Sequence, residues 1–458
     1  MVNIGDTMIE EIINKNGKEY LKVELIQITQ KNKKFYISKI SAKRFLKIYT
    51  VEPAEYDIER QANFASSFED DREYYEHLMN NDKERINKKS FQRPSNDTRV
   101  SEIKNFLNTN EIGLFPNSII VTCDLLNDKI GECNIAFNEV DSFENRPKSA
   151  YLEEIDNNIF LYIPYQKDSV LVIDGQHRLL GLKAASKEVT EDYELIITFI
   201  IGFDRSIVAN LFYTINYTQK SVNKSVLYHL MGEFSREIDK MAFMHGTIKI
   251  LNEIEESALY KRIKMLGNVP KSLSNEVRKQ MTISQAFLID YLIGYISKEA
   301  KNSIHQPIFY YYYKSENMRI EIIQFLLKYF DSIREALPEQ WDNVDEYILT
   351  KTVGLGACIK LLPFLYVKMF IDEYQMDPKK IVQINVNTLK NHLKGIETIN
   401  FSKSGEYGSV GSAGSLNKLK KQLIENIDFF QADNYEDFLR VFKENYLSKY
   451  KKWLTKYL

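Results

Sequence analysis

Cysteine is scarce in this chain of 458 residues, which has three, Cys123, Cys133 and Cys358. No pair has the short spacing of a zinc knuckle, and a reducing cytoplasm is the simplest compartment for such a chain. The six histidines are scattered and form no HExxH motif or histidine–cysteine cluster. We therefore expect no metal site built from a cluster of protein ligands, and no structural zinc.

Several other signatures are absent. The chain lacks a basic-then-apolar leader, and no apolar run approaches the roughly 18 residues that a bilayer span needs, so we expect neither secretion nor membrane insertion. It also lacks a GxSxG elbow. The glycines Gly408, Gly411 and Gly414 resemble a phosphate cradle but lack the GK[ST] ending of a Walker A motif. A plain linker, or a mobile loop that closes over a ligand, fits this stretch better.

The chain has no large excess of positive or negative charge, with 61 lysines and arginines and 63 acidic residues. Any contact with nucleic acid must therefore come from local basic patches. The composition, 44% hydrophobic and 27% charged, is typical of a globular protein. The length predicts two domains, or one domain with large additions.

The hydrophobic pattern predicts an α/β domain with a mixed sheet over residues 1–215, followed by a mainly helical region over 216–458. The strands are expected at 20–28, 34–40, 119–121, 158–163, 169–173 and 194–201. A charge-rich stretch near 57–90 is predicted to be a solvated helix or a mobile excursion of the first domain. A Gly/Ser-rich segment, 402–415, is predicted to be a flexible loop that leads into a basic helix.

The most informative motif is Asp174-Gly175-Gln176-His177-Arg178, which follows the apolar run 170–173. Asp-Gly predicts a tight turn, and residues 176–187 suit a helix. Unpaired N–H groups in the first turn of a helix favour phosphate, and Arg178 could add a bidentate fork. The carboxyl end of a strand in an α/β fold is also where ligands usually bind.

The same motif has a structural alternative. Asp174 could cap the helix, Gly175 could supply the turn, and Arg178 could pair with an acidic side chain. On the functional interpretation, Asp174 coordinates a magnesium ion or acts as a base toward water, and His177 contributes to catalysis. Both interpretations stay open at this point.

The motif and its surroundings resemble the DGQHR-domain proteins, a branch of the ParB and sulfiredoxin-like superfamily that includes DndB. The resemblance extends to Phe91-Gln92-Arg93 followed by Arg99, to residues 115–119 (FPNSI) and to 212–220 (FYTINYTQK), about half of the chain. It implies a ParB/sulfiredoxin-like fold for the first domain. It also implies an association with DNA-modification and defence systems.

The sulfiredoxin branch carries Gly-Cys-His-Arg where this chain has Gln176 in place of the cysteine. Glutamine forms no thiolate, so a reductase of that type is excluded. His177 and Arg178 keep the phosphate-binding half of the motif. The resemblance implies ATP or another nucleoside triphosphate with magnesium as cofactor, and DNA and other proteins of such a system as partners. A homo-oligomer is left open.

Gly175 and Gln176 are assigned to the phosphate site together with His177 and Arg178. The resemblance adds five further residues, Gln92, Arg93, Asn216, Gln219 and Lys220. Arg93 could grip a second phosphate, and the other interpretation is a surface arginine before a proline turn. Asn216, Gln219 and Lys220 could meet a ribose, a base or a phosphate. Alternatively, Asn216 is a left-handed cap that ends a helix.

Two basic segments are candidates for DNA contacts: Lys418, Lys420 and Lys421, and the tail lysines Lys451 and Lys452. In the tail, lysines alternate with aromatic residues, as in surfaces that bind phosphates and exposed bases. The aromatic residues also have helical spacing, which predicts an amphipathic helix packed on the body of the protein. The packing interpretation is preferred for the tail and for the tyrosine run at 310–313.

The sequence therefore predicts a DNA-binding regulatory or accessory protein of a DNA-modification or defence system that binds a nucleotide at the DGQHR motif. A DNA-linked nucleotide hydrolase is the first alternative. An assembly scaffold, in which the motif is only a structural turn, is the second.

Overall fold

The computed structural model describes twelve segments of the chain, 9–15, 17–51, 56–80, 97–109, 112–125, 149–203, 205–217, 223–235, 239–270, 272–302, 304–408 and 413–457. The chain divides into two compact units. The first comprises Met1–Glu55 and Ile86–Ser221, and the second comprises Tyr56–Arg85 and Val222–Leu458.

The first unit is built on a mixed sheet of nine strands in the order β4-β8-β5-β9-β3-β2-β7-β6, with β1 paired to β2. The strands are β1 (Glu10–Lys15), β2 (Lys18–Gln30), β3 (Lys33–Ser41), β4 (Tyr49–Thr50), β5 (Ile119–Thr122), β6 (Tyr151–Ile155), β7 (Asn158–Pro164), β8 (Val170–Asp174) and β9 (Glu194–Phe199). The pairs β4–β8 and β5–β9 are parallel, and the others are antiparallel. The predicted mixed sheet is confirmed.

Each of the six predicted strands is present within a few residues. The hairpin between β2 and β3 turns through Lys31 and Asn32, both in the left-handed region, and pairs Gln30 with Lys33. The strands β1, β4 and β6 were not predicted, and β4 has only two residues. Charged residues occupy half of β1 and two of the five positions of β6, so neither shows the apolar alternation on which the prediction depends.

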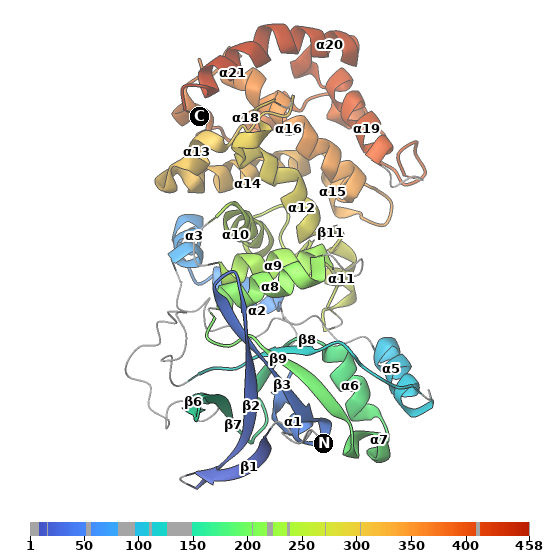
Figure 1. The fold of residues 1–458 in the computed structure, drawn as a ribbon. Helices are drawn as coiled ribbons and strands as arrows, with labels where there is room; N and C mark the ends of the chain where they lie inside the picture. Colours follow the sequence, from blue (N-terminus) through green and yellow to red (C-terminus); the bar gives the residue numbers. More distant parts are fainter. Residues whose placement is uncertain are drawn as a thin grey trace. The chain divides into compact units, whose positions relative to one another are not determined.

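Five helices accompany the sheet in the described part of this unit (Figure 1): α1 (Ala42–Ile48), α5 (Asp97–Thr109), α6 (Gln176–Ala184), α7 (Lys187–Glu191) and α8 (Arg205–Tyr217). Leu179 and Leu182 of α6 are buried in the same hydrophobic cluster as Val121 and Phe199 of the sheet. α5 packs beside α6. The predicted helix 176–187 is three residues too long, because α6 ends at Ala184 and the chain turns extended before α7.

The second unit is mainly helical, as predicted. Its helices are α2 (Ile58–Ala65), α3 (Asp71–Asn80), α9 (Lys224–Phe234), α10 (Lys240–Glu253), α11 (Asn275–Gln280), α12 (Gln285–Leu292), α13 (Tyr310–Lys314), α14 (Arg319–Ala336), α15 (Pro338–Asp342), α16 (Thr352–Asp372), α17 (Pro378–Ile381), α18 (Val386–His392), α19 (Ala413–Asn426), α20 (Tyr435–Val441) and α21 (Ser448–Leu454). The unit also contains one parallel pair of two-residue strands, β10 (Ile263–Lys264) and β11 (Ile283–Ser284).

The charge-rich stretch near 57–90 differs from the prediction in its described part. It is helical, as one of the two alternatives expected, but its helices α2 and α3 belong to the second unit, where both contact α10. Tyr74, Tyr75 and Met79 of α3 are buried there. The physical reason is that these few large side chains supply enough apolar surface to hold a helix in which four of the ten residues are charged.

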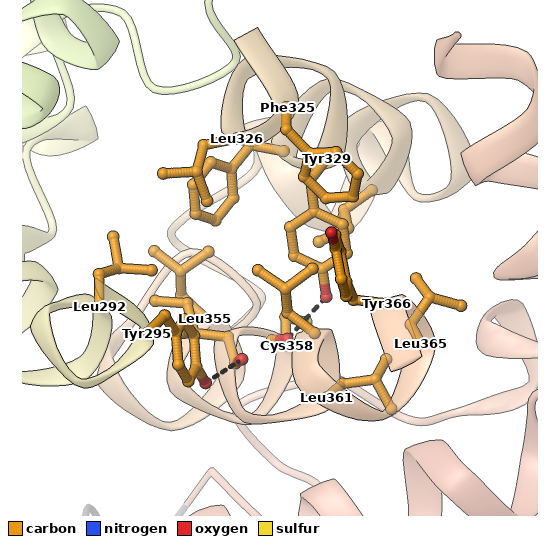
Figure 2. Close-up of a cluster of buried hydrophobic side chains, with 14 of the residues drawn as sticks. Leu292, Tyr295, Phe325, Leu326, Tyr329, Leu355, Cys358, Leu361, Leu365 and Tyr366 are labelled. Atoms are coloured by element: carbon orange, nitrogen blue, oxygen red, sulfur yellow. Dashed lines mark hydrogen bonds between the residues drawn. The ribbon is translucent and has the colours of Figure 1, made fainter. Parts of the chain in front are cut away.

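Helix α16 forms the centre of the helical core. Figure 2 shows its Leu355, Cys358 and Leu361 close to Tyr295 and to Tyr329 of α14. The hydroxyl groups of Tyr295 and Tyr329 donate to the carbonyl oxygens of Ile359 and Cys358 at 2.8 and 2.6 Å. By length and hydropathy α16 could cross a membrane, contrary to the expectation that no run approaches such a span, but 83% of its most apolar window is buried in the protein. Burial in the core accounts for its hydropathy.

The Gly/Ser-rich segment is only partly a loop. Residues 402–408 form turns, in which the Lys403 N–H donates to the Glu346 carbonyl at 2.8 Å and Tyr407 is buried. Helix α19 begins at Ala413, inside the predicted loop. Of the three glycines, Gly411 lies outside the described residues.

Candidate functional site

The DGQHR motif spans the junction between β8 and α6. β8 ends at Asp174 and α6 begins at Gln176, as the sequence predicts. Gly175 is the N-cap residue, with φ +101 in the left-handed region. A Cβ atom at this position would lie 2.6 Å from Cδ1 of Ile119 on β5. Glycine therefore provides both the backbone conformation and the space that bring β5 against the start of α6.

Arg178 fastens this junction to the segment before β5. Its Nη1 donates to the Asn117 carbonyl at 2.6 Å, and its Nη2 donates to the Ser118 carbonyl at 3.0 Å. Nη2 also donates to Oδ2 of Asp174 at 3.2 Å. Burial lowers the pKa of the Arg178 guanidinium, and the Asp174 carboxylate opposes that shift. Three of the hydrogen bonds that the Arg178 guanidinium can donate are thus made within the chain and not to a phosphate. The structural alternative expected such a pairing with an acidic side chain.

Asp174 does not cap α6. Its carboxylate accepts from Arg178, and the N-cap residue is Gly175, which has no side chain to offer. The first turn of α6 therefore keeps backbone N–H groups that no N-cap side chain satisfies. An anion at this position would experience the positive end of the helix dipole.

Gln176 and His177 are both buried, with 4% and 7% of their surface exposed, and both interact with other parts of the chain. Both side chains are therefore largely shielded from solvent. At this junction the side chains that a ligand from solvent would meet are those of Asp174 and Arg178, which are partly exposed.

Arg99 was not among the predicted site residues, although the resemblance included it. It lies on α5, the helix that packs beside α6, and its side chain is exposed. Its positive charge is close enough to Arg178 to lower the pKa of that guanidinium further. Two arginines thus lie on the adjacent helices α5 and α6, and arginine side chains are the usual partners of phosphate.

Other predicted site residues cannot be related to this junction. Gln92, Arg93, Gln219 and Lys220 lie outside the described residues. The backbone of Asn216 is part of α8, but its side chain is not described.

The lysines of α19 divide into two kinds. Lys418 and Lys421 are exposed, and Lys421 pairs with Glu436 at 3.1 Å. Lys420 is buried, donates to the Tyr435 hydroxyl at 2.6 Å and lies over the rings of Phe364 and Tyr435. Burial lowers the pKa of Lys420 to about 8. This placement removes Lys420 from the predicted DNA contacts.

The tail confirms the packing interpretation. Tyr450 and Trp453 of α21 are buried in the helical core, while Lys452 is exposed and Lys451 is half-buried. Tyr312, in the tyrosine run, is also buried. The tail lysines lie on the outer side of a helix that is held by its aromatic residues.

A second cluster of polar residues was missed by the sequence analysis, which expected no metal cluster. In the described part of the chain, His229, Glu233 and His245 place one ligand atom each within 4.8 Å of the others. His229 and Glu233 have the i, i+4 spacing that puts two side chains on one face of a helix, and this spacing was the available signal. His245 comes from another helix and could not be assigned to them from sequence.

Comparison with known proteins gives one result. A family model described as DndB, DNA-sulfur modification-associated, matches residues 23–407, most of the chain. Neither a curated protein nor a solved structure matches.

Proposed function

Because the chain belongs to the DndB family of DNA-sulfur modification-associated proteins, we propose that it is a DNA-binding accessory or regulatory protein of a DNA-modification and defence system. In this proposal it acts in the cytoplasm and binds a nucleoside triphosphate with magnesium at the first turn of α6. The observation that carries the nucleotide part is the pair of arginines on adjacent helices, Arg99 on α5 and Arg178 in the first turn of α6, beside an N-cap residue that has no side chain.

Each group at the start of α6 has a distinct part in this proposal. The positive end of the α6 helix dipole attracts the phosphate groups. Arg99 supplies charge from the solvent side, and Arg178 keeps Nε and one Nη1 hydrogen outside its three hydrogen bonds to described residues. Asp174 has a second carboxylate oxygen that can hold magnesium or its water.

Binding is a better match to this geometry than hydrolysis. His177 is buried, and the Asp174 carboxylate is paired with Arg178. A carboxylate that is held by a guanidinium is fixed in place by that pairing, and its other oxygen can act as a metal ligand.

The nucleotide part is tested by equilibrium binding of MgATP to the full chain and to Arg99→Ala. Arg99 is exposed, so its removal should leave the fold intact while weakening binding by about tenfold or more, the effect of one charge-assisted hydrogen bond. Lys104→Ala, an exposed cation on the same helix, is the control and should bind as the native chain does. If the native chain binds neither ATP nor any other nucleoside triphosphate, the nucleotide part is wrong. Turnover of bound ATP would instead support the hydrolase.

The DNA part depends on local basic surface. Lys418, Lys421 and Lys452 are exposed cations of the second unit and are the candidates for phosphate contacts. Affinity for duplex DNA should fall steeply with salt, and Lys418→Glu/Lys452→Glu should weaken binding and reduce the salt slope by about two. Lys394→Glu is the control for a charge change at another exposed position. Failure to retain DNA even at low salt would contradict the proposal and favour a scaffold.

A further inference from the structure

A buried group of histidine and carboxylate side chains lies between α9 and α10, two helices that pack side by side (Figure 1). His229 and Glu233 come from α9, and His245 comes from α10. All three are at least nine-tenths buried. Nε2 of His245 lies 2.9 Å from Oε1 of Glu233, and the rings of His229 and His245 are 5.0 Å apart, edge to face.

The close approach of the two helices is prepared by Gly232. A Cβ atom at this position would lie 2.3 Å from Cδ2 of His245, which is shorter than a van der Waals contact with the imidazole ring. Glycine therefore lets the His245 ring lie against α9, beside the side chain of Glu233.

Gln285 of α12 determines which nitrogen of His245 carries a proton. With the amide oriented so that its nitrogen donates to the Met265 carbonyl at 3.2 Å, its oxygen faces two groups at 3.1 Å: the backbone N–H of His229 and Nδ1 of His245. The His229 N–H can only donate, so the facing atom of Gln285 is the carbonyl oxygen. Nδ1 of His245 must therefore be protonated and donate to it.

With the proton on Nδ1, a neutral His245 presents the Nε2 lone pair to a carboxylate oxygen at 2.9 Å. Two acceptors at this separation repel, so a positively charged species must lie between them. It is either a second proton, carried by His245 as an imidazolium or by Glu233 as the neutral acid, or a metal ion. The position of His229 favours the metal ion over the proton. A shared proton needs only one donor and one acceptor, whereas a metal ion binds several ligand atoms, and His229 supplies a third.

We propose that His229, Glu233 and His245 bind a divalent first-row transition-metal ion, with zinc the best match. Two imidazole nitrogens and one carboxylate oxygen form a donor set that zinc accepts, and they leave a coordination position for water. Gln285 holds His245 from behind, and Lys249 donates to Oε1 of Glu233 at 3.1 Å, as outer partners of metal ligands commonly do. This inference concerns the second unit and is independent of the nucleotide proposal.

The chain contains a matched control for the competing protonated pair. His392 of α18 donates through Nδ1 to the Thr388 carbonyl at 2.5 Å and faces Oε1 of Glu373 with Nε2 at 2.6 Å. This pair has the same arrangement as His245 and Glu233. In the described residues, however, no third histidine, cysteine or carboxylate comes within reach of it as His229 does.

The experiment is metal analysis of the full, untagged chain purified without chelator, before and after equilibration with Zn²⁺ and dialysis. We expect close to one zinc per chain, reduced at least tenfold in His229→Gln and His245→Gln and unchanged in His392→Gln. Retention of one zinc in either of the first two variants would place the metal elsewhere and overturn the proposal. So would the absence of tightly bound metal from the native chain, which would identify the cluster as a protonated His–Glu pair with Lys249.

A second test needs no variant and therefore does not depend on whether the variants fold. In this test the native chain is loaded with Co²⁺. A cobalt spectrum from nitrogen and oxygen donors, removed by competing Zn²⁺, is the expected result. A sulfur-to-cobalt charge-transfer band would assign the metal to a cysteine and overturn the proposal. Removal of the ion should also lower the unfolding temperature of the native chain, and of His392→Gln to the same extent.

Discussion

Arg178 and Asp174 lie on either side of Gly175, and Nη2 of the arginine donates to Oδ2 of the aspartate at 3.2 Å. The same guanidinium also holds the carbonyl groups of Asn117 and Ser118. One residue of the DGQHR motif thus ties the end of β8, the start of α6 and the entry to β5 together. Loss of function in an Arg178 variant alone would therefore not distinguish binding from folding.

Arg178→Ala should destabilise the first unit by about 2–4 kcal/mol, because three hydrogen bonds are lost and two carbonyl groups lose a charged donor. Chemical denaturation monitored by circular dichroism measures the change. Lys183→Ala, an exposed residue of the same helix, should change the free energy of unfolding by less than about 0.5 kcal/mol. An equally small effect at Arg178 would mean that its hydrogen bonds do not stabilise the junction.

Gly175→Ala should cost about 1–3 kcal/mol, since alanine is strained at φ +101 and its Cβ would overlap Ile119. Gly294→Ala is a matched control, because nothing lies within 4 Å of a Cβ atom there and its φ is not positive. Thermal unfolding of both variants tests the difference. If the two changes had the same effect, a special role for Gly175 would be contradicted.

Lys420 predicts a pH dependence. Its pKa is about 8 in the folded chain against 10.5 for an ordinary lysine, so between these values the unfolded chain binds more protons. Its contribution to stability therefore rises with pH over this window, and below pH 8 the fold carries the full cost of burying the ammonium.

Lys420→Met removes this dependence. We compare the free energy of unfolding of the variant with that of the native chain at each pH. The difference in favour of the variant should be larger at pH 7 than at pH 10, by roughly 1–3 kcal/mol. Denaturation curves at the two pH values give the difference, and Lys418→Met, at an exposed position, should show none. A difference of the opposite sign would mean that the folded chain favours charged Lys420.

Trp453→Ala should destabilise the second unit by about 3–5 kcal/mol, because the indole is buried against the rings of Tyr311, Phe370 and Tyr457. Lys452→Ala, at the neighbouring exposed position, should have little effect on stability. Urea denaturation compares the two. A reversed order would mean that the tail is held by its charges rather than by its aromatic residues.

The local features of this chain follow from its sequence. Apolar runs and turn residues predict β2, β3, β5, β7, β8 and β9, and Asp174-Gly175 marks the change from strand to helix. These features depend on neighbours a few residues apart, so periodicity and turn chemistry suffice to find them. The mixed sheet followed by a mainly helical region was predictable for the same reason.

Tertiary structure decided which side chains meet. Asp174 pairs with Arg178 instead of capping α6, Lys420 is buried against Tyr435, and α3 packs against α10. His245 reaches His229 and Glu233 only because Gly232 lets its ring approach α9. Such partners come from separate elements and are selected by close packing across the fold, which no local pattern of residues encodes.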